Sequence, residues 1–331
     1  DVLGSRGLGD VYKRQGYEVS YMNSGKMTNK GWEFRVDAVP FENRDWRVGF
    51  YFNIAHNENK ITEMPDNYTE ENYTFNNGEY AYRREEGRPM GSFYGYRYKG
   101  VCQNKDATYA RDADGNVMKD ISGNAIVMRN GTATIAPGDA LYEDINHDGV
   151  INQYDIVYLG NSNPRFTGGA GVNVSYKQFK LSAIFYGRYG QDVVNSTRLN
   201  NESMRGIDNQ STAVLRRWRN EGDQTDIPRA LYGEGYNTLG SDRFVEDASY
   251  LRLKSLSFNY RLPKKIIQRW GFSNIDVYVT GYNLFTWTKY TGQDPEVKTE
   301  NTYARDSATT PASIQPVSYT HLRAHETLRH L

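Results

Sequence analysis

The sequence predicts an all-β fold of antiparallel strands, and it favours the wall of a membrane β-barrel over a soluble sandwich. Several segments alternate apolar and polar residues with a period of two, which indicates strands with two different faces. The chain also holds 27 Tyr and 31 Gly among 331 residues, while only 38% of the residues are hydrophobic. Tyrosine favours strands and interfaces, and glycine favours turns. The links between the alternating segments are either very short or very long.

Charge, cysteine content and hydropathy exclude several classes of protein. Forty Lys and Arg residues balance forty Asp and Glu residues, so the chain has no basic surplus that would indicate nucleic-acid binding. The single cysteine, Cys102, cannot form an internal disulfide. No apolar run reaches the ~18 residues of a transmembrane helix, which excludes a helical membrane protein. A membrane barrel has no such run either, because its strands alternate.

The first predicted strand pair is "WEFRVDAV" (32–39) with "WRVGFYFNIA" (46–55), joined by a short turn at 40–45. In both strands the even-numbered positions are apolar, while the odd-numbered positions are mostly polar or charged. Successive side chains of a strand point to opposite faces, so this alternation predicts one apolar face and one polar face.

Two further pairs follow the same pattern. The predicted strands lie at 169–176 with 179–189, and at 249–260 with 275–286. Their turns are expected at 176–179 and 262–273, and "KKIIQRWGF" in the second turn predicts one helical turn. The sequence therefore predicts six long strands in three hairpins.

The connections between these hairpins are much longer than the turns within them. They cover residues 57–165 and 191–246, and both are rich in Asn, Asp, Gly and Tyr. Compact soluble domains rarely hold structureless links of that length, whereas membrane barrels combine short turns at one end with long loops at the other. The polar strand positions carry Arg, Asp, Asn and Lys, as a wet lumen requires. A soluble antiparallel sandwich remains the alternative, since alternation is common to both.

The two ends differ from the interior in composition and pattern. Residues 1–15, "DVLGSRGLGDVYKRQ", and residues 317–331, "VSYTHLRAHETLRHL", resemble translated sequencing-adapter sequence. We therefore treat them as non-native tails and expect them to pack against nothing. The native segment is then 16–316.

The interior resembles the SusC/RagA family of TonB-dependent outer-membrane transporters. Seven segments carry the resemblance in the order in which the family has them, and together they cover essentially all of 16–300. They are "NSGKMTNKGWEFRV" (23–36), "FNIAHNENKI" (52–61), "GSFYGYRYKGV" (91–101), "GDALYEDINHDGVINQYDIVYLGNSNPRFTGG" (138–169), "LRRWRNEGDQTDIPRA" (215–230), "DASYLRLKSLSFNYRLPK" (247–264) and "GYNLFTWTKYTGQDPEV" (281–297).

The resemblance implies an outer-membrane barrel of ~22 strands in a Gram-negative bacterium, plugged by an N-terminal domain. It also implies a SusD-like lipoprotein partner, energy from the TonB complex, outer-membrane lipid around the barrel, and oligosaccharides or peptides as cargo. The signal peptide, plug, TonB box and closing strand of the family have no counterpart in this sequence. We therefore expect a C-terminal portion of the barrel, with about six strands in an open, curved sheet.

The stretch "EDINHDGVINQYD" has the ligand spacing of a calcium loop, with Gly149 at the sharp turn. The predicted ligands at positions 1, 3, 5, 7, 9 and 12 of that loop are Asp144, Asn146, Asp148, Val150, Asn152 and Asp155. Position 12 is Asp rather than the longer Glu that binds in a bidentate manner, and no amphipathic helix flanks the loop. The alternative is an Asx-rich turn in which side chains bind backbone amides without metal. In either form the loop is expected on the extracellular side.

Three other features have plainer interpretations. "RDADGNVMKD" (111–120) lacks the twelfth ligand, so it predicts a hairpin turn. The Tyr-rich segment 67–88 offers rings and polar groups for loop ordering, lid contact or sugar binding. Trp32, Trp46 and Trp287 lie near strand ends, where aromatic girdles anchor barrels.

The sequence shows no catalytic constellation, and we predict that the protein is not an enzyme. Outside the tails only two histidines occur, His56 and His147, and they are far apart in the sequence. No nucleophile elbow, phosphate loop or zinc spacing occurs. The alternative function is a soluble or surface-anchored carbohydrate-binding β protein with a dockerin-like calcium loop. Extraction by detergent but not by salt would distinguish the transporter from this alternative.

Overall fold

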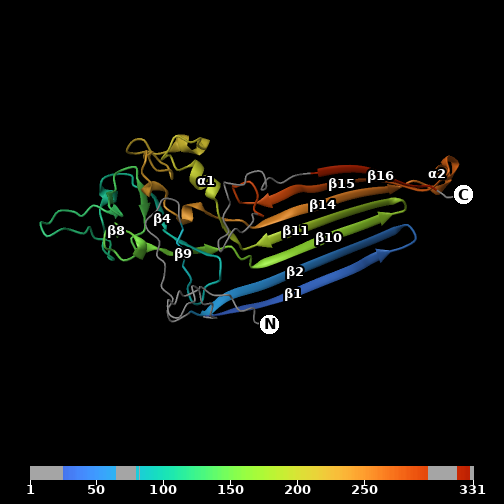
Figure 1. The fold of residues 1–331 in the computed structure, drawn as a ribbon, viewed down its shortest axis with the longest axis horizontal. Coiled ribbons are helices and arrows are strands. Elements are labelled where there is room, and N and C mark those ends of the chain that lie inside the picture. The colour runs from blue at the N-terminus through green and yellow to red at the C-terminus, as the bar shows by residue number, and fades with distance from the viewer. Residues whose placement is uncertain (1–24, 65–79, 82, 297–318, 329–331) are drawn as a thin grey trace, which may run out of the picture.

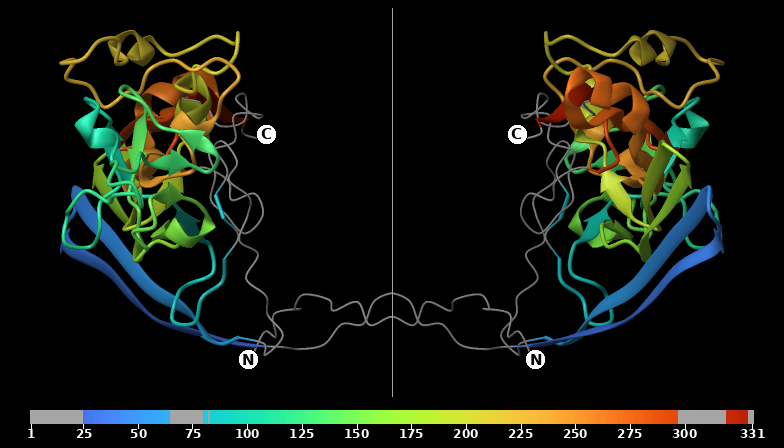
Figure 2. Two further views of the ribbon diagram at one scale, coloured as in Figure 1. Left: turned by 90° about the vertical axis from the view of Figure 1, so that its left-hand side faces the viewer. Right: turned by 90° about the vertical axis from the view of Figure 1, so that its right-hand side faces the viewer.

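The protein consists of a long antiparallel sheet and a loop lobe at one end of it (Figure 1). The computed structural model describes residues 25–64, 80–81 and 83–296, and the backbone of 319–328. We use "loop lobe" for residues 80–165 and 190–249, which form the connections between the hairpins. Viewed from its ends, the sheet is open and curved, as the sequence predicts (Figure 2).

Within the described residues, the main sheet has seven strands, all antiparallel, in the order β1-β2-β10-β11-β14-β15-β16. The long strands lie side by side in the same order in which they follow one another along the chain, so the sheet is an up-and-down meander. The strands are β1 Lys26–Glu42, β2 Trp46–Glu63, β10 Phe166–Tyr176, β11 Phe179–Tyr189, β14 Tyr250–Arg261, β15 Phe272–Thr288 and β16 Tyr319–Leu328.

The three predicted hairpins are confirmed. Each pairs the two predicted segments, although β1 and β2 extend several residues further than the alternation indicates. The predicted helical turn is also present, as α2 (Lys264–Ile267) followed by the 3-10 helix η6 (Gln268–Trp270). Gly271, with a φ of 82°, reverses the chain into β15, and a residue without a side chain adopts that conformation without strain.

The seventh strand corrects one expectation. Residues 317–331 were expected to pack against nothing, but the backbone of β16 pairs with β15 from Tyr282↔Tyr319 to Phe272↔Leu328. The physical reason is that the outer edge of β15 presents unpaired N–H and C=O groups, which accept any segment able to extend. The other tail, residues 1–15, lies outside the described residues.

The loop lobe contains short elements, where the sequence indicated only long links. Its strands pair with one another and not with the main sheet. They are β3 Ser92–Gly95, β4 Tyr98–Val101, β5 Arg129–Asn130, β6 Ala133–Thr134, β7 Ala140–Tyr142, β8 Val150–Ile151, β9 Val157–Asn161, β12 Asp192–Val194 and β13 Val245–Asp247. The helices are α1 Ser196–Asn201 and the 3-10 helices η1 Asp106–Thr108, η2 Gln153–Asp155, η3 Thr212–Arg216, η4 Tyr236–Thr238 and η5 Asp242–Phe244.

Most of the buried side chains lie in the loop lobe. One cluster gathers around Tyr94, Tyr142 and Ile151, and a second gathers around Phe93 and Phe244. Phe93 and Tyr94 are adjacent on β3 and point to opposite sides, so this short strand separates the two clusters. Each such side chain contributes about 1.5–3 kcal/mol on burial, so the lobe has cores of its own. No helix of the described residues is long and apolar enough to cross a membrane.

Candidate functional site

The main sheet keeps one apolar face and one polar face across its three hairpins. The strand registers place apolar residues opposite apolar residues, and polar residues opposite mostly polar ones, in rows that cross the sheet. A row on the apolar face is Val36, Phe52, Ala170, Phe185, Leu253 and Phe285. The neighbouring row on the polar face is Arg35, Asn53, Gly169, Tyr186, Arg252 and Thr286.

Large side chains of the apolar face are exposed on most of its strands. Phe34 is 53% exposed, Phe258 is 45% exposed and Phe285 is 60% exposed. In a soluble sandwich these side chains would form the core between two sheets, and they would be buried. A continuous exposed apolar surface of this size indicates an interface, and a membrane barrel turns such a face to lipid.

Aromatic residues mark both edges of the apolar face. At the turn end, Trp46 packs on Tyr176 with ring centroids 4.3 Å apart, and Phe179 stacks on Tyr260 at 4.6 Å. At the loop end, Trp32 lies 6.2 Å from Phe166.

These two aromatic bands are separated by the height of a bilayer's apolar region. Along β10, the bands lie ten residue steps apart, at Phe166 and Tyr176. Ten steps of about 3.3 Å span about 33 Å along the strand, or about 25 Å along the membrane normal at a strand tilt of about 40°. The strand-end positions predicted for Trp46 and Trp287 are confirmed, because Trp46 begins β2 and Trp287 is the last residue but one of β15. Trp32 corrects the prediction, because β1 begins at Lys26 and Trp32 lies inside the strand.

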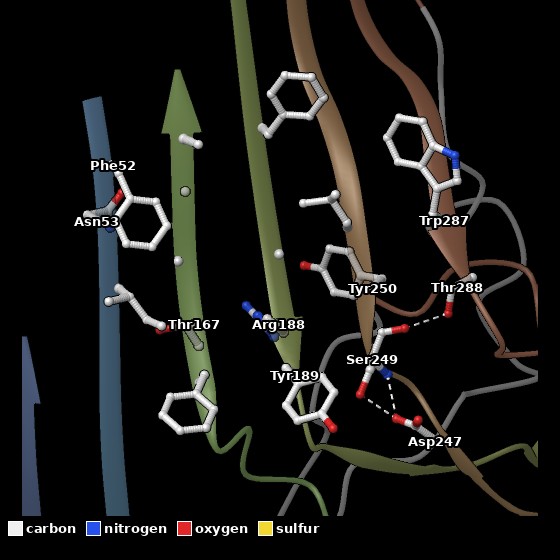
Figure 3. A pocket seen from close by; sticks show the side chains of 18 of the residues that line it. Phe52, Asn53, Thr167, Arg188, Tyr189, Asp247, Ser249, Tyr250, Trp287 and Thr288 are labelled. Atoms are coloured by element: carbon white, nitrogen blue, oxygen red, sulfur yellow. Dashed lines mark hydrogen bonds between the residues drawn. The ribbon is translucent and has the colours of Figure 1, made fainter. Parts of the chain in front are cut away.

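A groove of about 670 Å³ crosses the apolar face at the loop end (Figure 3). Its floor contains Gly168 and Gly187, where a Cβ atom would come within 2.5 Å of Asn53 O and 2.7 Å of Tyr250 O. These close backbone approaches require glycine. Aromatic side chains, including Phe52 and Trp287, stand beside this floor (Figure 3). The groove therefore belongs to the outer side of the sheet.

On the polar face, the loop end is held by ion pairs. Arg252 is only 3% exposed, and its guanidinium donates to Asp294, to Glu296 at 2.9 Å and to Thr286 at 2.9 Å. Lys254 donates to the same Glu296 at 2.7 Å. These bonds attach residues 294–296, which follow β15, to the inner face of β14.

A second buried ion pair joins the two halves of the loop lobe. Asp139 is fully buried and accepts from Arg229 at 2.7 and 3.1 Å and from Asn237 at 3.1 Å. Asn237 in turn accepts from the backbone N–H of Ala140 at 2.7 Å. Because these partners lie about 90 residues apart, the network links the first long connection to the second. No sequence pattern predicts this network, since isolated Asp, Arg and Asn residues are common in loops.

The six predicted calcium ligands lie in the segment between β7 and β9, with Val150 in β8 and Asp155 in η2. Asp144 accepts the backbone N–H of Gly149 at 2.7 Å, and Asp148 accepts that of Val150 at 2.7 Å and the side chain of Asn146 at 2.9 Å. Asp155 accepts from two backbone amides, and Asn152 caps η2. The side chains therefore form the hydrogen bonds of an Asx-rich turn.

The carboxylates of this segment lie close enough to repel one another. Burial raises the pKa of Asp155, and the charges of Asp144 and Asp148 raise it further, against the lowering effect of its backbone hydrogen bonds. Among the described residues, no group of three or more His, Cys, Asp or Glu side chains is arranged to hold a metal ion. The backbone bonds nevertheless leave carboxylate lone pairs free, so calcium binding remains a prediction.

Calcium is expected to protect this turn from proteolysis in the full-length protein. A cation would relieve the mutual repulsion of the carboxylates, and binding to the folded loop alone stabilises it. The measurement is cleavage within 144–155 at increasing calcium and after chelation. Protection should disappear in Asp144→Ala and persist in Asp112→Ala, which alters a similar turn without the twelfth ligand. Equal cleavage with and without calcium would leave the metal-free turn as the correct interpretation.

The remaining sequence predictions have mixed outcomes. The hairpin turn at 111–120 is confirmed, with Arg111 bridged to Val117 and Asp112 accepting the N–H of Asn116 at 2.8 Å. Most of the Tyr-rich segment 67–88 lies outside the described residues. Within its described part, Tyr80 donates to the carbonyl of Ser241 at 2.8 Å, which is a structural role.

An up-and-down sheet with one exposed apolar face, one polar face and a structured lobe at a single end is a segment of the wall of a β-barrel membrane protein. The comparisons with known proteins agree with this class. The chain belongs to the SusC/RagA group of TonB-dependent receptors.

The similar proteins include receptors from two bacteria. TonB-dependent receptor P3 of Formosa agariphila is 32% identical over 296 residues, which are 86% of this chain and 27% of that protein. TonB-dependent receptor SusC of Bacteroides thetaiotaomicron is 26% identical over 286 residues, or 83% of this chain and 25% of that protein. No protein-family model matches the chain.

Among solved structures, the RagAB peptide transporter superposes with a TM-score of 0.62 at 25% identity, over 93% of this chain and 30% of that chain. The RagAB peptide importer in its closed-closed state gives 0.64 at 22% identity, which shows the shared fold. The chain thus spans about a quarter of the length of the curated relatives that it matches.

Proposed function

We propose that this chain forms part of the barrel wall of an outer-membrane importer in a Gram-negative bacterium. The observation that carries the proposal is the pair of faces on the main sheet. The apolar face has the height of a bilayer's apolar region, and the opposite face is polar enough to line a wet lumen. Lipid then covers the apolar face, and the loop lobe stands on the extracellular side.

The cargo of this importer is an oligosaccharide or a peptide, and the import is driven by the TonB complex together with a SusD-like lipoprotein. The likeness to SusC and to the RagAB peptide transporter supports this assignment. The matched relatives are receptors and transporters, which supports a protein without enzymatic activity.

The first test is extraction of the full-length protein from membranes. Detergent is expected to release it, whereas concentrated salt is not, because apolar contacts with lipid do not weaken in salt. Recovery in the soluble fraction without detergent would favour the carbohydrate-binding alternative and reject the importer.

The second test is uptake by cells from which the gene has been deleted. Growth on, or uptake of, labelled oligosaccharides or peptides is expected to fall and to return when the full-length gene is restored. Restoration should fail when TonB is absent, because import through a plugged barrel requires an external energy source. Uptake that is unchanged by the deletion would reject the proposal.

A further inference from the structure

A polar cavity of about 590 Å³ lies in the loop lobe beside α1. Its lining comes from three segments, 195–202, 211–216 and 291–293. Among the described residues, every residue that lines the cavity is polar, charged or glycine, and none is aromatic or aliphatic. Binding cavities in proteins are usually lined mainly by apolar side chains, so this composition indicates a ligand whose own surface is polar.

The carboxylates around this cavity are already neutralised by the protein's own residues. Glu202 accepts from Arg198 at 3.0 Å and from Arg243 at 2.8 Å. Glu246 accepts from the same Arg198 at 3.1 Å and from Thr291 at 2.8 Å. Burial opposes ionisation of Glu246, but the bonds from Thr291 and Arg198 outweigh it and lower its pKa. Two arginines thus match two glutamates.

A third arginine in the lining has no partner for its charge among the described residues. Arg216 ends η3, and its exposed side chain has no hydrogen bond or ion pair with any other residue in the described ranges. Asn201 and Gln293 are exposed in the same lining, and their side-chain amides also make no hydrogen bond within the described ranges. The cavity therefore offers one net positive charge and two amide groups.

We propose that this cavity is a subsite for an acidic saccharide, with Arg216 binding the anionic group of the sugar and Asn201 and Gln293 binding its hydroxyls. The inference rests on the proposed function and narrows its cargo. A guanidinium presents several N–H donors in a fixed plane, which suits a carboxylate or a sulfate. A neutral sugar is typically held by stacking on an aromatic ring, and no aromatic residue lines the cavity among the described residues.

The test is binding to the purified full-length protein in detergent, measured by calorimetry. The probes are oligogalacturonate, which carries carboxylates, a sulfated galactan oligosaccharide, and maltohexaose, which is neutral. The wild type is expected to prefer one or both acidic probes, and the preferred probe identifies the anionic group. Arg216→Gln should weaken that binding about tenfold, as expected for the loss of one charge-assisted hydrogen bond, without changing maltohexaose binding.

The matched control is Arg44→Gln, which removes the same charge from the exposed turn between β1 and β2, at the opposite end of the sheet. It should bind all probes as the wild type does. Arg216→Lys, which keeps the charge, should retain part of the acidic preference and so separates binding from misfolding. Acidic binding that is unaffected by Arg216→Gln, or lost equally with neutral binding, would overturn the inference while leaving import intact. Binding of peptides alone would also overturn it, whereas failure of the uptake test would reject the proposed function itself.

Discussion

Val172→Arg should destabilise the full-length barrel by about 2–4 kcal/mol, the usual effect of arginine at the lipid-facing midplane of a membrane barrel. Val172 lies near the middle of β10, is 42% exposed, and shares its row on the apolar face with Phe50 and Ala183. A guanidinium at that depth must either lose its hydration or draw water into the bilayer. The measurement is the free energy of unfolding in urea, with the protein folded into lipid vesicles.

The matched control is the next residue along the strand. Asn173→Arg places the same charge on the polar face, where Asn173 accepts from Ser182 at 2.8 Å. Its loss of one hydrogen bond should lower stability by about 1 kcal/mol. Equal effects of the two variants would mean that both faces meet the same environment, which contradicts a barrel wall.

The long strands could be predicted from the sequence because their alternation is a local property. Each even-numbered apolar position of 32–39 and 46–55 lies on one face in the structure, and hairpins with short turns leave little choice of register. The same reasoning could not predict β16, since residues 317–331 show no clean alternation. That strand exists because β15 has an open edge, which is a property of the sheet and not of the segment.

The architecture of the loop lobe could not be predicted, for a different reason. Its strands are mostly two to five residues long, too short to establish a period. Its cores come from residues far apart in the chain, such as Tyr142 with Leu239, whose backbone N–H donates to the Tyr142 hydroxyl at 3.1 Å. The candidate calcium loop can be read from the sequence because its spacing is local. The role of Arg216 cannot, because an arginine without a hydrogen-bond or ion-pair partner is recognised only when its spatial neighbours are known.

The buried pair Asp139–Arg229 gives the second large prediction, which concerns the loop lobe. Arg229→Met should destabilise the lobe by about 3–5 kcal/mol, because it leaves the Asp139 carboxylate buried without a cation. Asp139→Asn should have a smaller effect of about 1–2 kcal/mol, since the freed Arg229 side chain is already 34% exposed and can turn to water. The readout is hydrogen exchange of the lobe amides in the full-length protein, with the barrel strands as the internal reference.

The double variant Asp139→Asn with Arg229→Met distinguishes a buried charge from a simple loss of contacts. If the unpaired carboxylate is the source of the damage, the double variant should be more stable than Arg229→Met alone. Arg111→Met serves as the control within the lobe, because its partner Asp106 lies 3.0 Å away in an exposed pair worth less than about 1 kcal/mol. A double variant that is no better than Arg229→Met would mean that the arginine acts mainly through packing. In that case the link between the two long connections would rest on the hydrogen bonds of Asn237 and on the apolar clusters, and not on the ion pair.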